Sequence, residues 1–202
     1  MTAAPHSPAV GPDSPLTPVM RALESTGALD PVVAVGDAVA RIAAGNDRVR
    51  GVLQGRKLGH AVHPLLVEVP MGTWLSALLL DVLGGPGERG AARMLTGVGV
   101  LSAVPSALTG WAEYSGAQRR DRRVAVVHAA ANGLATGLQA GSWVARHVGR
   151  DGLGRTLGLS GMGVAGLGGY LGGHLAIART VGTRDVVYTR DEAQTGRVTP
   201  AR

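Results

Sequence analysis

Apolar residues dominate four long stretches of the chain, at residues 64–84, 91–110, 124–145 and 153–178. A helix needs about 20 apolar residues to cross the hydrocarbon core of a bilayer, and the four stretches approach or exceed this length. The first two are the most hydrophobic, and glycine dilutes the fourth. The pattern predicts an all-α protein, a four-helix transmembrane bundle. It disfavours the alternative, a soluble helical bundle rich in alanine and glycine.

Small residues recur at every fourth position of the last two stretches, which places them on one face of a helix. Membrane helices associate through close backbone approach at such residues, whereas a glycine inside a soluble helix costs about 1 kcal/mol relative to alanine. We therefore expect these faces to pack in the bundle. The residues are Gly133, Gly137 and Gly141 in the third stretch and Gly161, Ala165, Gly169 and Gly173 in the fourth.

The residues before the first stretch predict an amphipathic N-terminal helix on the membrane surface or on the bundle. Asp30 and Pro31 suit its N-cap and first residue, and Asp37 and Arg41 are spaced to form an ion pair. Its apolar face comprises Val32, Val35, Val39 and Ile42. A second short helix is expected around residues 18–25. The predicted organisation is a disordered N-terminus (1–15), an amphipathic helical preface (16–57), a four-span domain (58–180) and a C-terminal tail (181–202).

The composition is unusual for a soluble protein, with 45% apolar and only 17% charged residues, no phenylalanine and no cysteine. Without cysteine, this chain forms no disulfide and ligates no iron–sulfur cluster. The net charge of +6 comes almost wholly from arginine, and the arginines gather at the ends of the apolar stretches. Because they form no basic stripe with interleaved aromatic residues, nucleic acid is not an expected partner. The lipid bilayer is the expected partner.

The basic residues also predict an orientation. Eleven flank one side of the four stretches and five flank the other, and basic residues favour the cytoplasmic side. We expect a multi-pass protein of the bacterial inner membrane with both termini in the cytoplasm and no cleaved signal peptide. The eleven are Arg48, Arg50, Arg56, Lys57, Arg119, Arg120, Arg122, Arg123, Arg179, Arg184 and Arg190; the five are Arg89, Arg93, Arg146, Arg150 and Arg155.

Histidine and glutamate are predicted to meet at the cytoplasmic leaflet, because the stretches alternate in direction and three of them bring histidine to that side. Ionisable residues within membrane segments are costly and usually mark a functional site. The candidate residues are His60, His63, Glu68, Glu113, His128 and His174. Asp81, near the far end of the first stretch, is interpreted as a hydrated helix-end residue.

Several functions fit these residues. Imidazoles from facing helices hold haem b in membrane four-helix bundles, with His63 and His128 as the first pair and His174 next. Glu68 and Glu113 would orient these ligands or hold a proton. The alternatives are direct binding of Fe or Zn, a proton or ion pathway, a transporter, and a structural hydrogen-bond network. His60 and His63 also suit a role at the helix start. We predict a haem-binding protein that transfers electrons. The sequence does not decide whether it is an enzyme.

The segment KLGHAVHPLLVEVPMGTWLSALLLDVLGG resembles the signature of the DUF2231 family of bacterial membrane proteins, and ALTGWAEYSG, VVHAAAN and GGYLGGHLA extend the match. The resemblance covers about residues 30–180, in particular to members fused to a C-terminal Rieske domain. It implies an electron-transfer setting and a Rieske-type or other redox protein as partner. Lys57 and Ala61 depart from the pattern, as do Glu68 and Glu113, where aspartate is usual. Retention of an acid at both positions implies that charge or ligation matters there.

Overall fold

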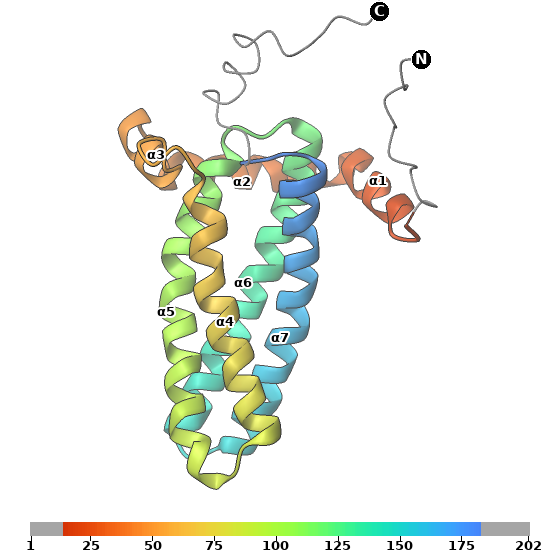
Figure 1. Ribbon diagram of the computed structural model, residues 1–202. Helices are drawn as coiled ribbons and strands as arrows, with labels where there is room; N and C mark the ends of the chain where they lie inside the picture. Colours follow the sequence, from red (N-terminus) through yellow and green to blue (C-terminus); the bar gives the residue numbers. More distant parts are fainter. Residues whose placement is uncertain (1–13, 183–202) are drawn as a thin grey trace, which may run out of the picture.

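The computed structural model describes residues 14–182, and within this range it contains helices and no strand. Four long helices run side by side and alternate in direction (Figure 1). Their bounds are α4 Val62–Leu83, α5 Arg89–Tyr114, α6 Arg119–His147 and α7 Asp151–Gly173. Each predicted apolar stretch therefore forms one helix, and α7 continues into a π-helical turn at His174–Ala178. The predicted disordered N-terminus and C-terminal tail lie almost wholly outside the described residues.

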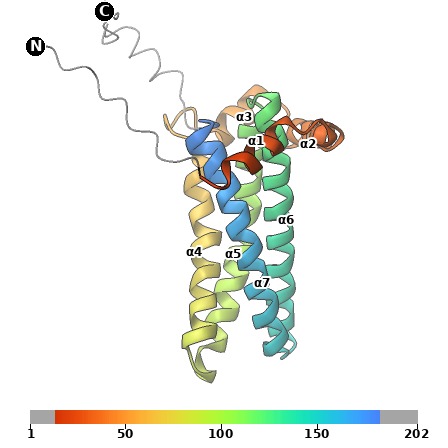
Figure 2. The ribbon, with the colours of Figure 1, turned by 90° about the vertical axis from the view of Figure 1, so that its right-hand side faces the viewer.

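Three shorter helices gather at one end of the bundle, as Figures 1 and 2 show. They are α1 Thr17–Ser25, α2 Asp30–Ala43 and α3 Asp47–Leu53. The 3₁₀ turn Gly27–Leu29 joins α1 to α2, and the turn Pro86–Glu88 joins α4 to α5 at the opposite end. α2 runs across the outer side of α5 and α6 and contacts both.

α2 contacts the bundle through a face other than the predicted apolar one. The predicted face, which includes Val35 and Ile42, is exposed. A glycine makes the observed contact possible, because a Cβ at Gly36 would lie only 2.8 Å from the Val126 side chain of α6. An apolar stripe left exposed beside the bundle suits a helix in the interfacial layer of a membrane. The residues buried against the bundle are Val33, Gly36 and Ala40.

The two aspartates of α2 bind side chains of α5 and α6. Neither of them caps α2 or forms the predicted ion pair within it. The N-cap position falls one residue before Asp30. The Asp30 carboxylate instead pairs with Arg123 and Arg119, at 2.9 and 2.7 Å, and these hydrogen bonds lower its pKa from the usual 3.8 to about 2. Asp37, expected to pair with Arg41, binds a tyrosine of α5 and an arginine of α6. The two aspartates therefore fasten α2 to the bundle.

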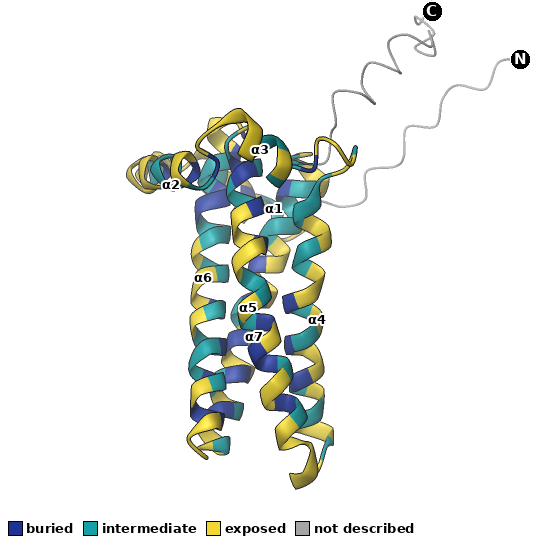
Figure 3. Cartoon of the chain, turned by 90° about the vertical axis from the view of Figure 1, so that its left-hand side faces the viewer, coloured by how far each residue is buried: buried dark blue, intermediate teal, exposed yellow. Residues whose placement is uncertain are grey.

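The apolar core lies at the end of the bundle that carries α1 and α2. Along the shafts of the four helices, exposed residues cover much of the outer surface (Figure 3), and the buried positions are mostly small or polar. Large apolar side chains exposed along a whole helix suit contact with lipid better than with water. The core comprises Met20, Val33, Ala40, Tyr114, Val124, Ala125, Val126 and Leu175.

Glycines of α7 let it approach α6 closely, but the predicted faces are only partly the ones that pack. A Cβ at Gly154 would lie 2.6 Å from Arg146 Cγ. Polar side chains of α6 face α7, because Gln139 and Ser142 donate to backbone carbonyls of α7 at 3.1 and 2.6 Å. This choice of face turns some predicted glycines outward. Gly133, Gly137, Gly169 and Gly173 have open space at the Cβ position, whereas Gly141, Gly161 and Ala165 do pack.

Packing between α4 and α5 satisfies a carbonyl that proline leaves free. Pro70 has no N–H, so the carbonyl of Leu66 loses its donor within α4. Ser106 Oγ of α5 donates to this oxygen at 3.0 Å. α5 also accommodates a tryptophan from each neighbouring helix. A Cβ at Gly97 would lie 2.6 Å from Nε1 of Trp143 in α6, and the next glycine, Gly99, faces the tryptophan of α4.

Candidate functional site

His63 lies in the first turn of α4 and bonds to α5. Its Nδ1 is 2.9 Å from the carbonyl oxygen of Ser106 and 3.2 Å from Thr109 Oγ1. The ring lies against Gly110, where a Cβ would come within 2.9 Å of His63 Cε1. Glycine at this position therefore allows the imidazole to pack directly on the backbone of α5.

His128 makes the same contacts between α6 and α7. Its Nδ1 is 2.8 Å from the carbonyl oxygen of Gly168, and a Cβ at Gly172 would come within 2.8 Å of His128 Cε1. The Asn132 amide nitrogen lies 3.2 Å from both ring nitrogens and donates to the His128 carbonyl at 2.9 Å. Equal distances to the two nitrogens place the amide over the face of the ring. The Nε2 lone pair lies in the ring plane and is not occupied by that amide.

These contacts assign one tautomer to both histidines. A carbonyl oxygen only accepts, so Nδ1 of a neutral imidazole carries the proton and Nε2 carries the lone pair. Metal-ligating histidines usually show this arrangement, in which a carbonyl or carboxylate holds the nitrogen that does not bind the metal. His63 and His128 come from different hairpins, and each ring is held by a carbonyl of the other helix of its own hairpin. They therefore form a pair of imidazoles oriented in the same way.

The two histidines occupy equivalent positions of a repeated hairpin. Deeper in the bundle, Trp74 Nε1 of α4 donates to the carbonyl of Thr96 in α5, and Gln139 Nε2 of α6 donates to the carbonyl of Gly158 in α7. Both donors follow the histidine of their own helix by 11 residues, and both acceptors precede the histidine's acceptor by 10. The α4–α5 and α6–α7 hairpins therefore share one register, which puts the two histidines at the same depth.

The repeat carries opposite charges at one further pair of positions. Asp81 and Arg146 each follow the histidine of their helix by 18 residues, five helical turns. They bind one another through two hydrogen bonds of 2.9 and 2.6 Å, and their side chains are only 9% and 2% exposed. The interpretation of Asp81 as a hydrated helix-end residue is therefore wrong. It is half of a buried ion pair that joins the two hairpins.

His174 lies outside the pair formed by the other two histidines. It begins the π-helical turn after α7, and its Nε2 is 2.7 Å from Glu24 Oε1 of α1. Arg179 approaches the same carboxylate at 3.6 Å and pairs with Asp121 at 2.7 Å. The side chain of His174 thus fastens α1 to the end of the bundle.

The remaining candidates do not meet the histidine pair in one cluster. Glu68 lies five residues after His63, about 140° around the helix, and is exposed without a hydrogen bond or ion pair to the described residues. Glu113 is half-buried near the end of α5, beside Gly182, and His60 is exposed before α4. No three His, Asp or Glu side chains in the described part of the chain gather as metal ligands. The ligand roles of all six candidates stay predictions.

The fold and this site define an all-helical protein with two helices apolar and long enough to cross a membrane. These are Val62–Leu83 and Pro86–Tyr114, with mean hydropathies of 1.5 and 1.3. The family model of predicted membrane proteins designated DUF2231 matches residues 59–185. The chain belongs to this family, which confirms the resemblance. No curated protein and no solved structure matches the chain.

Proposed function

We propose that α4 to α7 all span the bacterial inner membrane, with the end that carries α1 to α3 at the cytoplasmic face. α6 and α7 run alongside the two helices that are apolar enough to cross by themselves (Figure 1). Gln139 and Ser142 of α6 point inward, where they donate to backbone carbonyls of α7, and leucines such as Leu134, Leu159 and Leu167 point outward. Four arginines in the first turns of α6 mark the cytoplasmic side.

We propose further that this bundle binds haem b between His63 and His128 and transfers electrons. The observation that carries this function is the equivalent placement of two imidazoles whose Nδ1 atoms are both held by backbone carbonyls. A porphyrin supplies four nitrogens to its iron, so a haem needs only two ligands from the protein. A structural or catalytic Zn site takes three or four protein ligands. A pair of histidines without a third ligand among residues 14–182 therefore favours haem over direct binding of Fe or Zn.

The residues around the pair have defined roles in this function. The carbonyls of Ser106 and Gly168 orient the rings and make Nε2 the ligating atom. Gly110 and Gly172 keep the space that the rings occupy. A bound haem supplies one-electron transfer, and a Rieske-type or other redox protein is the proposed partner.

An absorption spectrum of the full chain, purified in detergent from cells supplied with haem precursor, tests this function. We expect a Soret band and, after reduction with dithionite, the sharp visible bands of six-coordinate haem b. His63→Ala and His128→Ala should each abolish the six-coordinate spectrum. His147→Ala is the matched control, because His147 also holds its Nδ1 to a carbonyl, at 2.9 Å, but is exposed at the opposite end of the bundle.

A wild-type protein without a Soret band, even after addition of haem, would overturn the haem proposal. Elemental analysis of the same sample then separates the alternatives: stoichiometric Fe or Zn without haem absorption indicates a direct metal site. If neither is bound and His128→Ala only lowers thermal stability, the histidines form a structural hydrogen-bond network. Substrate flux in liposomes that requires Glu68 would indicate a transporter.

A further inference from the structure

A concavity of about 420 Å³ opens between α1 and the start of α6, at the end of the bundle opposite the α4–α5 turn. Its size falls within the roughly 300–1,000 Å³ of ligand-binding clefts. Three of the five residues that line it are arginines. The lining comprises Arg21, Glu24, Ser25, Arg120 and Arg123.

Two of the three arginines in the concavity have no acidic partner among the described residues. Arg123 is engaged with Asp30 and with the backbone carbonyl of Glu24. The Glu24 carboxylate is itself taken by His174 and an arginine of the π-helical turn. Arg21 and Arg120 are exposed and have no hydrogen bond or ion pair with the described residues. The concavity therefore presents two free guanidinium groups, which are strong donors to phosphate oxygens.

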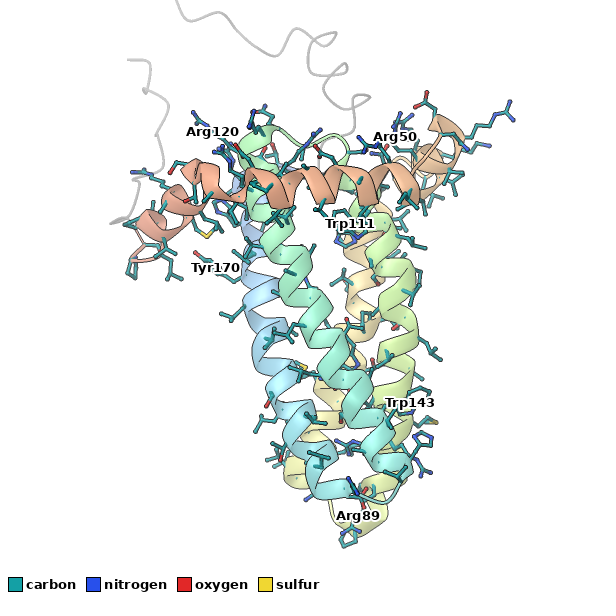
Figure 4. All side chains as sticks on the ribbon, turned by 180° about the vertical axis from the view of Figure 1, so that it is seen from behind. Arg50, Arg89, Trp111, Arg120, Trp143 and Tyr170 are labelled. Atoms are coloured by element: carbon teal, nitrogen blue, oxygen red, sulfur yellow. The ribbon has the colours of Figure 1, made fainter. Side chains whose placement is uncertain are left out.

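An exposed aromatic side chain lies beyond the concavity on the shaft of the bundle. It is Tyr170 of α7, which is 44% exposed and lies one helical turn before His174, the residue that binds Glu24. Figure 4 shows Arg120 at the end of the bundle and Tyr170 further along the shaft, on the side of α1. Tyrosine is enriched where the headgroups of a bilayer meet its hydrocarbon. Charge followed by an aromatic side chain and then by exposed leucine such as Leu167 of α7 matches a phospholipid, with its phosphate above its acyl chains.

We propose that this concavity is a binding site for an anionic phospholipid, with Arg21 and Arg120 holding the phosphate and Tyr170 contacting the glycerol and acyl region. The site ties α1 to one lipid at the membrane surface. The proposed haem ligands take no part in it. Each basic residue near an anionic surface contributes a factor of about five in affinity, so two arginines account for about 25-fold.

Native mass spectrometry of the full chain in detergent, titrated with phosphatidylglycerol or phosphatidylcholine, tests the site. We expect wild-type protein to prefer phosphatidylglycerol, Arg21→Gln and Arg120→Gln to weaken its binding about fivefold each, and the double variant about 25-fold. Arg48→Gln is the matched control. Arg48 is exposed on α3 at the same end of the bundle and likewise has no partner among the described residues, so this change should alter binding less than twofold.

Three results would overturn the proposal. Equal binding of both lipids shows that the phosphate and net charge of the lipid are not recognised. A loss with Arg48→Gln as large as with Arg120→Gln shows a diffuse charge effect and no site. Displacement of phosphatidylglycerol by excess inorganic phosphate shows a site for free phosphate that does not select lipid. Because Arg21 and Arg120 are exposed and unpaired, their substitution should leave the fold intact, which the haem spectrum and thermal unfolding of each variant check.

Discussion

The ion pair between Asp81 and Arg146 should be the strongest single link between the two hairpins. Both side chains are nearly inaccessible, and two hydrogen bonds join them. Asp81→Asn keeps the shape of the side chain but leaves the Arg146 charge buried, with only Ser142 as a remaining hydrogen-bond partner on its own helix. Breaking a buried pair by removing one partner costs about 3–5 kcal/mol. Arg155, at 3.6 Å from the same carboxylate, carries the same charge as Arg146 and cannot compensate it.

A double-mutant cycle measures how strongly the two charged side chains couple. The double variant Asp81→Leu/Arg146→Leu removes both charges and leaves neither partner unpaired, so it should be more stable than either single variant, Asp81→Leu or Arg146→Leu. The sum of the two single losses should exceed the loss in the double variant by about 3 kcal/mol or more. Equilibrium unfolding of the full chain in mixed micelles, followed by far-UV circular dichroism, measures the four free energies.

A surface ion pair supplies the control. Arg89 and Asp151 meet at 3.3 Å, but their side chains are 54% and 29% exposed. Arg89→Gln should cost less than about 1 kcal/mol, because water screens such pairs. A strong buried ion pair is refuted if Asp81→Asn costs no more than Arg89→Gln, or if the loss in the double variant equals the sum of the two single losses. Either result would mean that water reaches the pair and that packing alone joins the hairpins.

Three further outcomes follow from single contacts. Gly97→Ala should lower the free energy of unfolding by about 1–3 kcal/mol, because the added Cβ overlaps Trp143. Gly163→Ala, whose added Cβ meets open space, should leave the free energy of unfolding unchanged or raise it by up to about 1 kcal/mol. Thermal unfolding compares the two variants. Ser106→Ala should cost about 1–3 kcal/mol in the same assay, because the carbonyl freed by the proline of α4 loses its donor. The contribution of the Asp30 carboxylate to docking of α2 should be complete above about pH 4 and lost as the pH falls to about 2, since folding lowers the pKa of this carboxyl. A carboxyl NMR titration measures the pKa of Asp30 in the folded protein. A midpoint near 3.8 would contradict the prediction.

Local pattern was sufficient to predict the helices because each one depends on residues near in sequence. All four long helices lie where the apolar stretches are, and the short helix expected around residues 18–25 is α1. The pattern was a poorer guide to how each helix is turned about its own axis. For α2, the predicted apolar face and the face of Val33, Gly36 and Ala40 both satisfy helical spacing, and contact with α5 and α6 decides that the second is buried. For α6, glycine spacing pointed to one face, but hydrogen bonds from Gln139 and Ser142 select another.

The candidate site shows the same division. The alternating direction of the stretches was enough to place His63 and His128 at one level, and their equal spacing to later residues of α4 and α6 can be read directly from the chain. Sequence alone could not reveal that backbone carbonyls of Ser106 and Gly168 hold the rings, because every residue carries a carbonyl and only the packed neighbour determines which one is used.

By itself, the sequence determined the all-helical class, the positions of the four long helices, the family and the two histidines of the pair, because composition and periodicity act within one helix. The tertiary structure alone decided that His174 binds Glu24 of α1, that Glu68 faces outward and that Asp81 is buried against Arg146. Each of these depends on how one helix is rotated relative to its neighbour. A rotation of about 100° per residue moves a side chain between interior and exterior, and only contacts with distant residues set that angle.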